Sequence, residues 1–268
     1  MRLTVDHVTR YHYDRPVRSV VQSHRLTPSV FAGQKTAGWE VTVSGGVCGS
    51  VFRDGAGDLV QAWTVAGPVS EVTVRVQGIV ETVDLTGVLR GHKEIVAPDC
   101  YLQATLPTRA DTALEALARA AQGADPLALA HALSAAVADA IAYRPGVTSA
   151  HTTAAEALAL GEGVCQDHAH ALIAVARVRG LPGRYVSGYL FADADGQSHE
   201  AAHAWAELHL PGLGWVGFDP ANRCCPDDRY IRLGSGFDAQ DAAPIRGIAR
   251  GGGKEEMDVT VAILQASQ

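Results

Sequence analysis

The first third of the chain alternates apolar and polar residues with a period of two. Apolar, often β-branched side chains occupy every second position in three stretches: Leu3 and Val5; Trp39, Val41 and Val43; and Val72, Val74 and Val76. Such alternation predicts half-buried β-strands. Glycine-rich segments at 44–46 and 54–58 are typical of the turns that join neighbouring strands. We therefore expect an N-terminal antiparallel β domain, arranged as a sandwich, over residues 1–90.

The pattern changes to helical spacing after a weakly patterned stretch that contains Pro98 and Pro107. Three helices are predicted, over about residues 112–122, 127–141 and 153–160. Their N-terminal capping signals are Thr112 with Glu115, Asp125 before Pro126, and Thr153 with Glu156.

A fourth helix is expected to begin at Cys165, directly after the glycine-containing loop at 161–164, and to end before Gly180 and Pro182. Beyond this helix the pattern predicts strands at 185–191, 204–210, 215–218, 230–233 and 257–264. Helices followed by an antiparallel sheet form an α+β domain, which we place at residues 91–268.

The composition restricts the expected partners and compartment. The 268 residues include 22 Lys and Arg against 29 Asp and Glu, a net charge of −7, without a basic run. This argues against nucleic-acid binding. No stretch approaches the ~20 apolar residues that span a bilayer, and the N-terminus lacks an apolar signal core, so we expect no membrane association and a cytoplasmic location. Five scattered cysteines do not form a disulfide framework, and their odd number leaves at least one thiol free.

Cys165 occupies a position that favours a reactive thiolate. A helix N-terminus stabilises negative charge, and its first N–H groups lack helical acceptors and can hold an oxyanion. Gly161 and Gly163 allow the preceding loop to turn tightly and leave the sulfur accessible. A cysteine in this place can equally be a small buried apolar residue, so its position alone does not establish a nucleophile.

His203 and Asp219 are predicted to meet across a β-hairpin. His203 lies where one strand begins, and Asp219 ends the next strand after a turn at 211–214. In an antiparallel hairpin the start of one strand lies beside the end of the other. Asp219 could then accept a hydrogen bond from His203, although a structural histidine and a turn-initiating aspartate would give the same sequence.

Four separated blocks resemble those of bacterial transglutaminase-like proteins and occur in the same order. They are 161–167 (GEGVCQD), 183–189 (GRYVSGY), 203–207 (HAWAE) and 214–220 (GWVGFDP). Similarity at 11–17, 101–103 and 143–146 extends the resemblance over nearly the whole chain. The chain departs from the family pattern at His168, where an aromatic residue is common, and at Ala221, where a hydroxyl residue usually precedes the asparagine.

The resemblance implies a papain-like catalytic core in which Cys165 is the nucleophile, His203 the base and Asp219 the orienting acid. It implies no metal and no organic cofactor. The reaction implied is cysteine-dependent amide hydrolysis or acyl transfer, of protease or transglutaminase type, through an acyl-thioester intermediate. The expected partner is a peptide or protein substrate with an amide or a glutamine side chain. The choice between hydrolysis and transfer, and the oligomeric state, do not follow from the sequence.

Other residues near these blocks are candidates for the cleft or the oxyanion hole: Gln166, Tyr143, Trp205 and Glu207. Glu207 shares a strand face with His203. Asp167 lies beside the nucleophile, and we expect it to cap the helix of Cys165 instead of acting in catalysis.

Two other functions remain open at this level. A metal site could use the surplus histidines, which are His168, His170, His199 and His203. Residues two apart on a helix point to different sides, however, and residues four apart on a strand are distant for one ion. A catalytically silent protein could instead bind peptides through its β domain. The presence of all three residues, Cys165, His203 and Asp219, favours an enzyme, because a binding protein does not require a nucleophile at a helix start.

Overall fold

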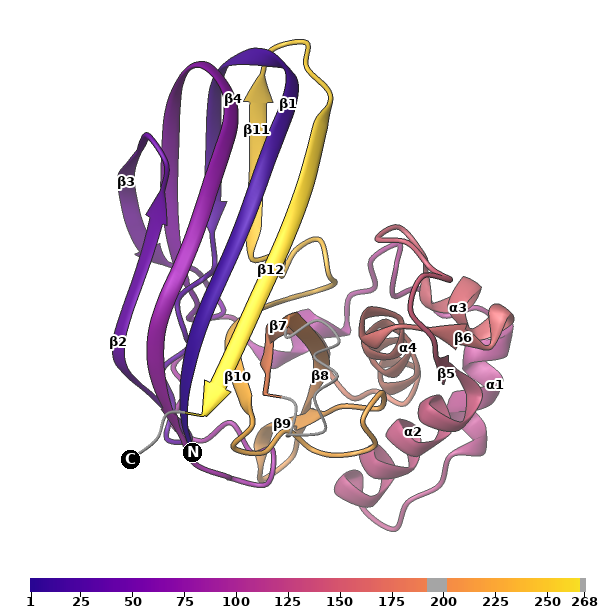
Figure 1. Cartoon of the computed structure of the whole chain (residues 1–268). Helices are drawn as coiled ribbons and strands as arrows, with labels where there is room; N and C mark the ends of the chain where they lie inside the picture. The colour runs from indigo at the N-terminus through magenta and orange to yellow at the C-terminus, as the bar shows by residue number, and fades with distance from the viewer. Residues whose placement is uncertain (192–201, 266–268) are drawn as a thin grey trace.

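The computed structural model describes residues 1–191 and 202–265, which form two parts with a sheet in each (Figure 1). The first part contains six strands, all paired antiparallel: β1 (Arg2–His24), β2 (Gln34–Val43), β3 (Gly46–Arg53), β4 (Leu59–Thr82), β11 (Ile245–Arg250) and β12 (Glu255–Gln265).

The long strands β1 and β4 fold this sheet into two layers. Residues 2–12 of β1 pair with the second half of β4, whereas residues 19–24 pair with its first half. The register shifts on both sides of Val17, and β1 turns over at the far end of the sheet (Figure 1). One layer therefore carries β2 and β12 beside the long strands, and the other carries β3 and β11. The predicted sandwich is confirmed, with Val, Leu and Tyr side chains between its layers.

The last two strands of the chain belong to this first sheet. β11 pairs with residues 19–24 of β1, and β12 pairs with residues 3–13. The predicted domain boundary at residue 90 placed both strands in the second domain. In the structure they pair with β1 of the first sheet instead. Alternating side chains identify a strand and its buried face, but they do not say which distant strand it joins.

Four α-helices follow the short 3-10 helix η1 (Pro98–Leu102): α1 (Thr112–Ala120), α2 (Pro126–Ala140), α3 (Ala154–Leu160) and α4 (Cys165–Val178). Asp125 caps α2, and Thr153 with Glu156 forms a capping box on α3, as predicted. Helix α1 is capped by Asp111 and not by a box at Thr112, because aspartate is at least as good an N-cap as threonine and directly precedes it. Among the described helices, none is both long and apolar enough to cross a membrane.

The second sheet is antiparallel and has the strand order β10–β7–β8–β9. Its strands are β7 (Gly183–Leu190), β8 (Ala202–Leu210), β9 (Gly214–Phe218) and β10 (Tyr230–Gly236). Helix α4 packs on one face of β8, where Ala204, Ala206 and Leu208 join the helical core. Alternate residues of β8, including Trp205, point to the opposite face. Helices packed on this sheet give the predicted α+β class.

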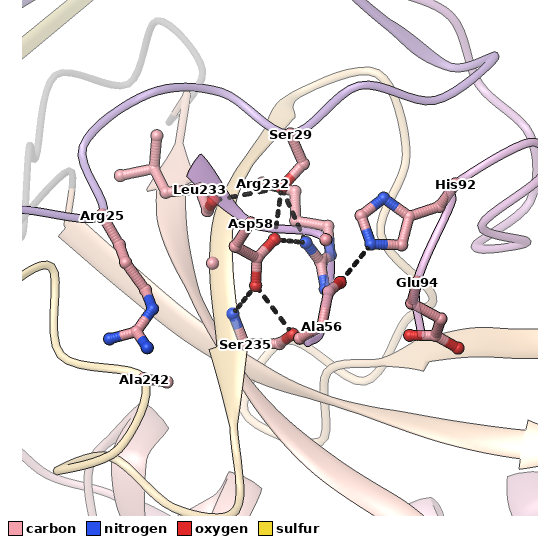
Figure 2. A network of polar contacts seen from close by, with 12 residues as sticks. Arg25, Ser29, Ala56, Asp58, His92, Glu94, Arg232, Leu233, Ser235 and Ala242 are labelled. Atoms are coloured by element: carbon pink, nitrogen blue, oxygen red, sulfur yellow. Dashed lines mark hydrogen bonds and ion pairs between the residues drawn. The ribbon is translucent and has the colours of Figure 1, made fainter. Parts of the chain in front are cut away.

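Buried charges join the two parts of the molecule. Asp58, directly before β4, accepts hydrogen bonds from Arg232 of β10 and from Ser235 N, both at 2.7 Å (Figure 2). Arg232 also donates to Glu207 of β8 at 2.8 Å and to Ser29 at 2.6 Å. Asp58 and Arg232 are 0% and 2% exposed. Because loss of one partner would leave the other charge buried and uncompensated, this network fixes the sandwich against the second sheet.

Candidate active site

Cys165 is the first residue of α4, and its side chain is partly exposed. The loop before it is held by two short parallel strands, β5 (Ala142–Tyr143) and β6 (Glu162–Gly163). Gly163 is needed in this loop, because a Cβ there would lie 2.8 Å from Asp167. The thiol therefore lies at a helix N-terminus, beside first-turn N–H groups that have no helical acceptor.

Asp167 serves this helix as a capping residue. It is 0% exposed, and its Oδ2 accepts hydrogen bonds from Val164 N at 2.8 Å and from Thr148 Oγ1 at 2.6 Å. A carboxylate in the first turn also interacts favourably with the helix dipole. These contacts confirm the expected structural role of Asp167.

His203 and Asp219 are hydrogen-bonded across the β8–β9 hairpin. Ala206 pairs with Phe218 in the ladder, so Asp219, one residue further on, lies beside the first half of β8. His203 Nε2 is 2.6 Å from Asp219 Oδ2, and the two side chains are 8% and 1% exposed. The hairpin thus brings the two residues together in the way that their positions in the sequence predicted.

The electrostatics of the site favour a charged imidazole. Burial acts to lower the pKa of His203, but hydrogen bonds to Asp219 and with Cys165 outweigh it and raise this pKa to about 10. Burial acts in turn to raise the pKa of Asp219, and hydrogen bonds from His203, Asn222 and Tyr230 hold it below its usual value. At neutral pH the imidazole of His203 therefore carries a positive charge beside the carboxylate of Asp219. The pKa of His203 therefore depends on two residues from separate segments, Asp219 and Cys165.

Two further side chains reach the carboxylate of Asp219. Tyr230 Oη donates to Oδ2 at 2.8 Å, and Asn222 Nδ2 donates to the same oxygen at 2.7 Å. Trp205 lies beside His203, with ring centroids 6.4 Å apart and ring planes 26° apart. Tyr230 could not be identified from the sequence, because it lies 11 positions beyond Asp219 and no local pattern marks a contact across an irregular loop.

Comparison with known proteins places this arrangement in a family. Residues 115–220 match the transglutaminase-like superfamily, and residues 3–81 match the bacterial transglutaminase-like N-terminal region. An uncharacterized protein of Mycobacterium leprae is 33% identical over 275 residues, which cover 98% of each chain. The chain belongs to the transglutaminase-like superfamily.

Two further similarities extend over most of this transglutaminase-like chain. An uncharacterized protein of Mycobacterium tuberculosis H37Rv is 31% identical over 273 residues, covering 92% of this chain and 87% of the relative. The crystal structure of a candidate cysteine protease from Cytophaga hutchinsonii matches with a TM-score of 0.74 at 20% identity, covering 100% of this chain and 92% of that one. At this identity the structural likeness concerns the fold, and it supports the predicted combination of sandwich and cysteine-protease-like core.

Two of the predicted cleft residues lie around the start of α4 in this transglutaminase-like core. The amide nitrogen of Gln166 is 3.5 Å from Ser149 O and 3.4 Å from Ala150 O. Tyr143, on β5, is 46% exposed, and its ring centroid is 6.3 Å from that of His168. A role of either side chain as an oxyanion donor stays a prediction.

Glu207 shares the strand face of His203, as predicted, but its carboxylate is engaged elsewhere. It is 3% exposed and accepts from Arg184 Nε at 2.7 Å and from Arg232 Nε at 2.8 Å. Burial acts to raise the pKa of Glu207, and the two guanidinium groups outweigh it and lower this pKa to about 2. Strand alternation predicted the face of Glu207 but not these two ion pairs, and a role of Glu207 in the cleft stays a prediction.

The alternative of a histidine metal site finds no support in the part of the chain that the structure describes. Across residues 1–191 and 202–265, no three His, Cys, Asp or Glu side chains are grouped so that they could hold an ion. Both ring nitrogens of His168 lie within 2.9 Å of backbone carbonyl oxygens. His170 Nε2 accepts from Ala239 N at 3.0 Å, and burial lowers the pKa of His170 to about 4. His199 lies outside the described residues.

Proposed function

We propose that the protein catalyses cysteine-dependent acyl transfer from an amide, with Cys165 as nucleophile, His203 as acid and base, and Asp219 as the residue that orients His203. The observation that carries this proposal is the position of the His203 ring: its Nε2 is 2.6 Å from Asp219 Oδ2, and Cys165 is near enough to act, with Asp219, to raise the pKa of the imidazole. Membership of the transglutaminase-like superfamily supports it.

In the first half of the reaction, the Cys165 thiolate attacks the amide carbonyl carbon. A C–S bond forms, and the carbonyl π electrons move to the oxygen, which the N–H groups of Cys165 and Gln166 at the start of α4 can stabilise. When this tetrahedral intermediate collapses, the C–N bond breaks and the leaving nitrogen takes the proton of His203. An acyl-thioester on Cys165 and neutral His203 remain.

In the second half, the acyl group passes to an incoming nucleophile. Neutral His203 removes a proton from water or from an amine, which attacks the thioester carbonyl. The C–S bond then breaks, and the thiolate of Cys165 and the imidazolium of His203 are restored. Water completes hydrolysis of protease type, and an amine such as a lysine side chain completes transamidation.

The substrate class that fits this chemistry is a peptide or protein with an accessible amide or glutamine side chain. Members of the superfamily generally act on protein substrates. The described residues hold no group of metal ligands, and no step of the scheme uses a metal ion.

The test is to trap the acyl intermediate. The protein is incubated with a library of glutamine-containing peptides, quenched in acid and digested, and the mass gained by the peptide that contains Cys165 is measured. We expect an acyl adduct on Cys165, which a primary amine releases as an amide and water releases as an acid. Cys165→Ala should give no adduct, while the matched control Cys48→Ala, which changes an exposed thiol on β3, should behave as wild type. Turnover by folded Cys165→Ala would refute the mechanism.

A further inference from the structure

Asp219 Oδ2 accepts hydrogen bonds from three different side chains. His203 Nε2 lies at 2.6 Å, Asn222 Nδ2 at 2.7 Å and Tyr230 Oη at 2.8 Å. The other oxygen, Oδ1, accepts only the weaker bond from Asn222 N at 3.2 Å among the described residues. The carboxylate oxygen that orients His203 is therefore shared, and each additional donor withdraws part of its negative charge.

Tyr230 is held firmly in this arrangement. It is 5% exposed, and its ring meets that of Trp205 edge to face, with centroids 5.5 Å apart. Its ring also contacts His203 at a centroid distance of 5.9 Å. The hydroxyl therefore has a fixed direction toward Asp219 and little freedom to turn away.

The thiol of Cys224 supports the same direction. Cys224 Sγ is 3.3 Å from Tyr230 Oη. The phenol has a single proton, and the ionised Asp219 can only accept, so Tyr230 donates to Asp219 and accepts from the thiol. Burial and the neighbouring charge of Asp219 raise the pKa of Tyr230 above its ordinary value, which keeps the proton on the phenol.

We propose that Tyr230 is a positioning residue that limits how strongly Asp219 holds the proton of His203. This inference rests on the proposed function and adds a residue to its machinery. By competing for Oδ2, the phenol lets Asp219 orient the ring without drawing its proton away. The proton then stays available to the leaving nitrogen on the other side of the imidazole.

The described side chains around the proton of His203 come from four segments. Cys165 faces His203 from α4, and Tyr230 and Cys224 face Asp219 from β10 and from the loop before it. Asn222 and Trp205 lie there without charge, and the ion pair of Arg229 with Asp227 acts on Cys224 from the same loop. The Tyr230 hydroxyl points the positive end of its dipole at Asp219. Without it, Asp219 keeps more negative charge, so His203 should bind its proton more tightly.

The experiment compares Tyr230→Phe with the matched control Tyr189→Phe in the full-length protein. Tyr189 is also buried, and its hydroxyl is 2.7 Å from His7 Nδ1 in the other part of the molecule. The titration of His203 is followed by NMR with labelled histidine, and His203→Gln identifies its signal. We expect Tyr230→Phe to move the midpoint upward from about 10 by roughly half a unit to one unit. Tyr189→Phe should leave it unchanged.

Turnover provides a second measurement. Tyr230→Phe should lower kcat by up to about tenfold, with KM unchanged, because His203 delivers its proton less readily. An unchanged His203 midpoint in Tyr230→Phe, or an equal shift in Tyr189→Phe, would overturn the proposal. If Tyr230→Phe does not fold, Cys224→Ala replaces it. This variant should move the His203 midpoint upward by a smaller amount, and an unchanged midpoint there would also overturn the proposal. Because the NMR titration needs no substrate, it decides this point even if wild-type protein shows no acyl transfer.

Discussion

His203 Nε2 and Asp219 Oδ2 form a hydrogen bond of 2.6 Å between residues 16 positions apart in the chain. Both side chains are nearly inaccessible to water, and a charged hydrogen bond is stronger where water is excluded. The strand pairing of β8 with β9 sets this distance. The acid–base behaviour of the site therefore depends on the hairpin as much as on the two residues.

Asp219→Asn should lower the pKa of His203 from about 10 toward its ordinary value of 6.5, because the imidazolium loses its carboxylate partner. NMR titration of His203 measures this change, and kcat/KM should fall by roughly 10²- to 10⁴-fold. Because the pKa of His203 is raised in the folded protein, protonated His203 stabilises the fold. This contribution is complete below pH 6.5 and is lost as the pH rises through about 10. The difference in unfolding free energy between the variant and wild type should therefore shrink above pH 10. A variant whose His203 still titrates near 10 would contradict this account.

Cys165 should react with iodoacetamide before the other four cysteines. It begins α4 and lies near His203, and a helix N-terminus beside a histidine is the setting in which a cysteine acts as a nucleophile. Burial further raises the pKa of Cys224, and it raises that of Cys225 to about 11. Mass spectrometry of the digested protein over time gives the order of labelling.

The control for this labelling is His203→Gln, which removes the imidazolium and should abolish the preference for Cys165. The exposed thiols Cys48 and Cys100 are the internal competitors. Labelling of either one ahead of Cys165 in wild-type protein would argue against Cys165 as the nucleophile.

Glu207→Gln should destabilise the fold without acting directly at the reacting sulfur. Its carboxylate lies between Arg184 and Arg232, and removing its charge leaves two buried guanidinium groups without that partner. Such a loss costs about 3–5 kcal/mol, which lowers Tm by roughly 10 °C in a chain of this size. Differential scanning calorimetry measures this effect. The control is Glu115→Gln, which breaks an exposed ion pair with Arg119 on α1 and should change Tm little.

The same variant should alter acid unfolding. The pKa of Glu207 is lowered from 4.5 to about 2, so its contribution to stability is present above pH 4.5 and is lost as the pH falls through about 2. The stability difference between wild type and Glu207→Gln should therefore decrease over this pH range. A difference that does not depend on pH would show that the carboxylate is not ionised in the folded protein.

A chain that ends at Gly253 lacks β12 and should lose stability in its N-terminal sandwich. Residues 3–13 of β1 pair with β12, so the truncation turns β1 into an edge strand with unpaired backbone groups. We expect a lower Tm and faster amide exchange in residues 3–13 than in a control chain that ends at Gln265. Unchanged exchange in residues 3–13 would mean that the sandwich does not need the C-terminal strand.

The sequence alone was enough to predict several parts of the site. The start of a helix at Cys165 follows from a glycine loop and helical spacing, and the hairpin between His203 and Asp219 follows from two apolar runs around a short turn. These are local signals, because backbone periodicity and turn chemistry are set by residues close in sequence. For the same reason the capping residues Asp125 and Thr153 were predicted correctly.

Contacts between distant segments were decided only in the tertiary structure. Glu207 alternates on the same face as His203, but its burial between two arginines depends on β7 and β10. Tyr230 reaches Asp219 from another strand, and β12 joins β1 across nearly the whole length of the chain. A local pattern states which face of a strand is buried, but the partner is chosen by packing and by pairing of charges and backbone groups. Those energies depend on all the segments at once, and no single stretch of sequence contains them.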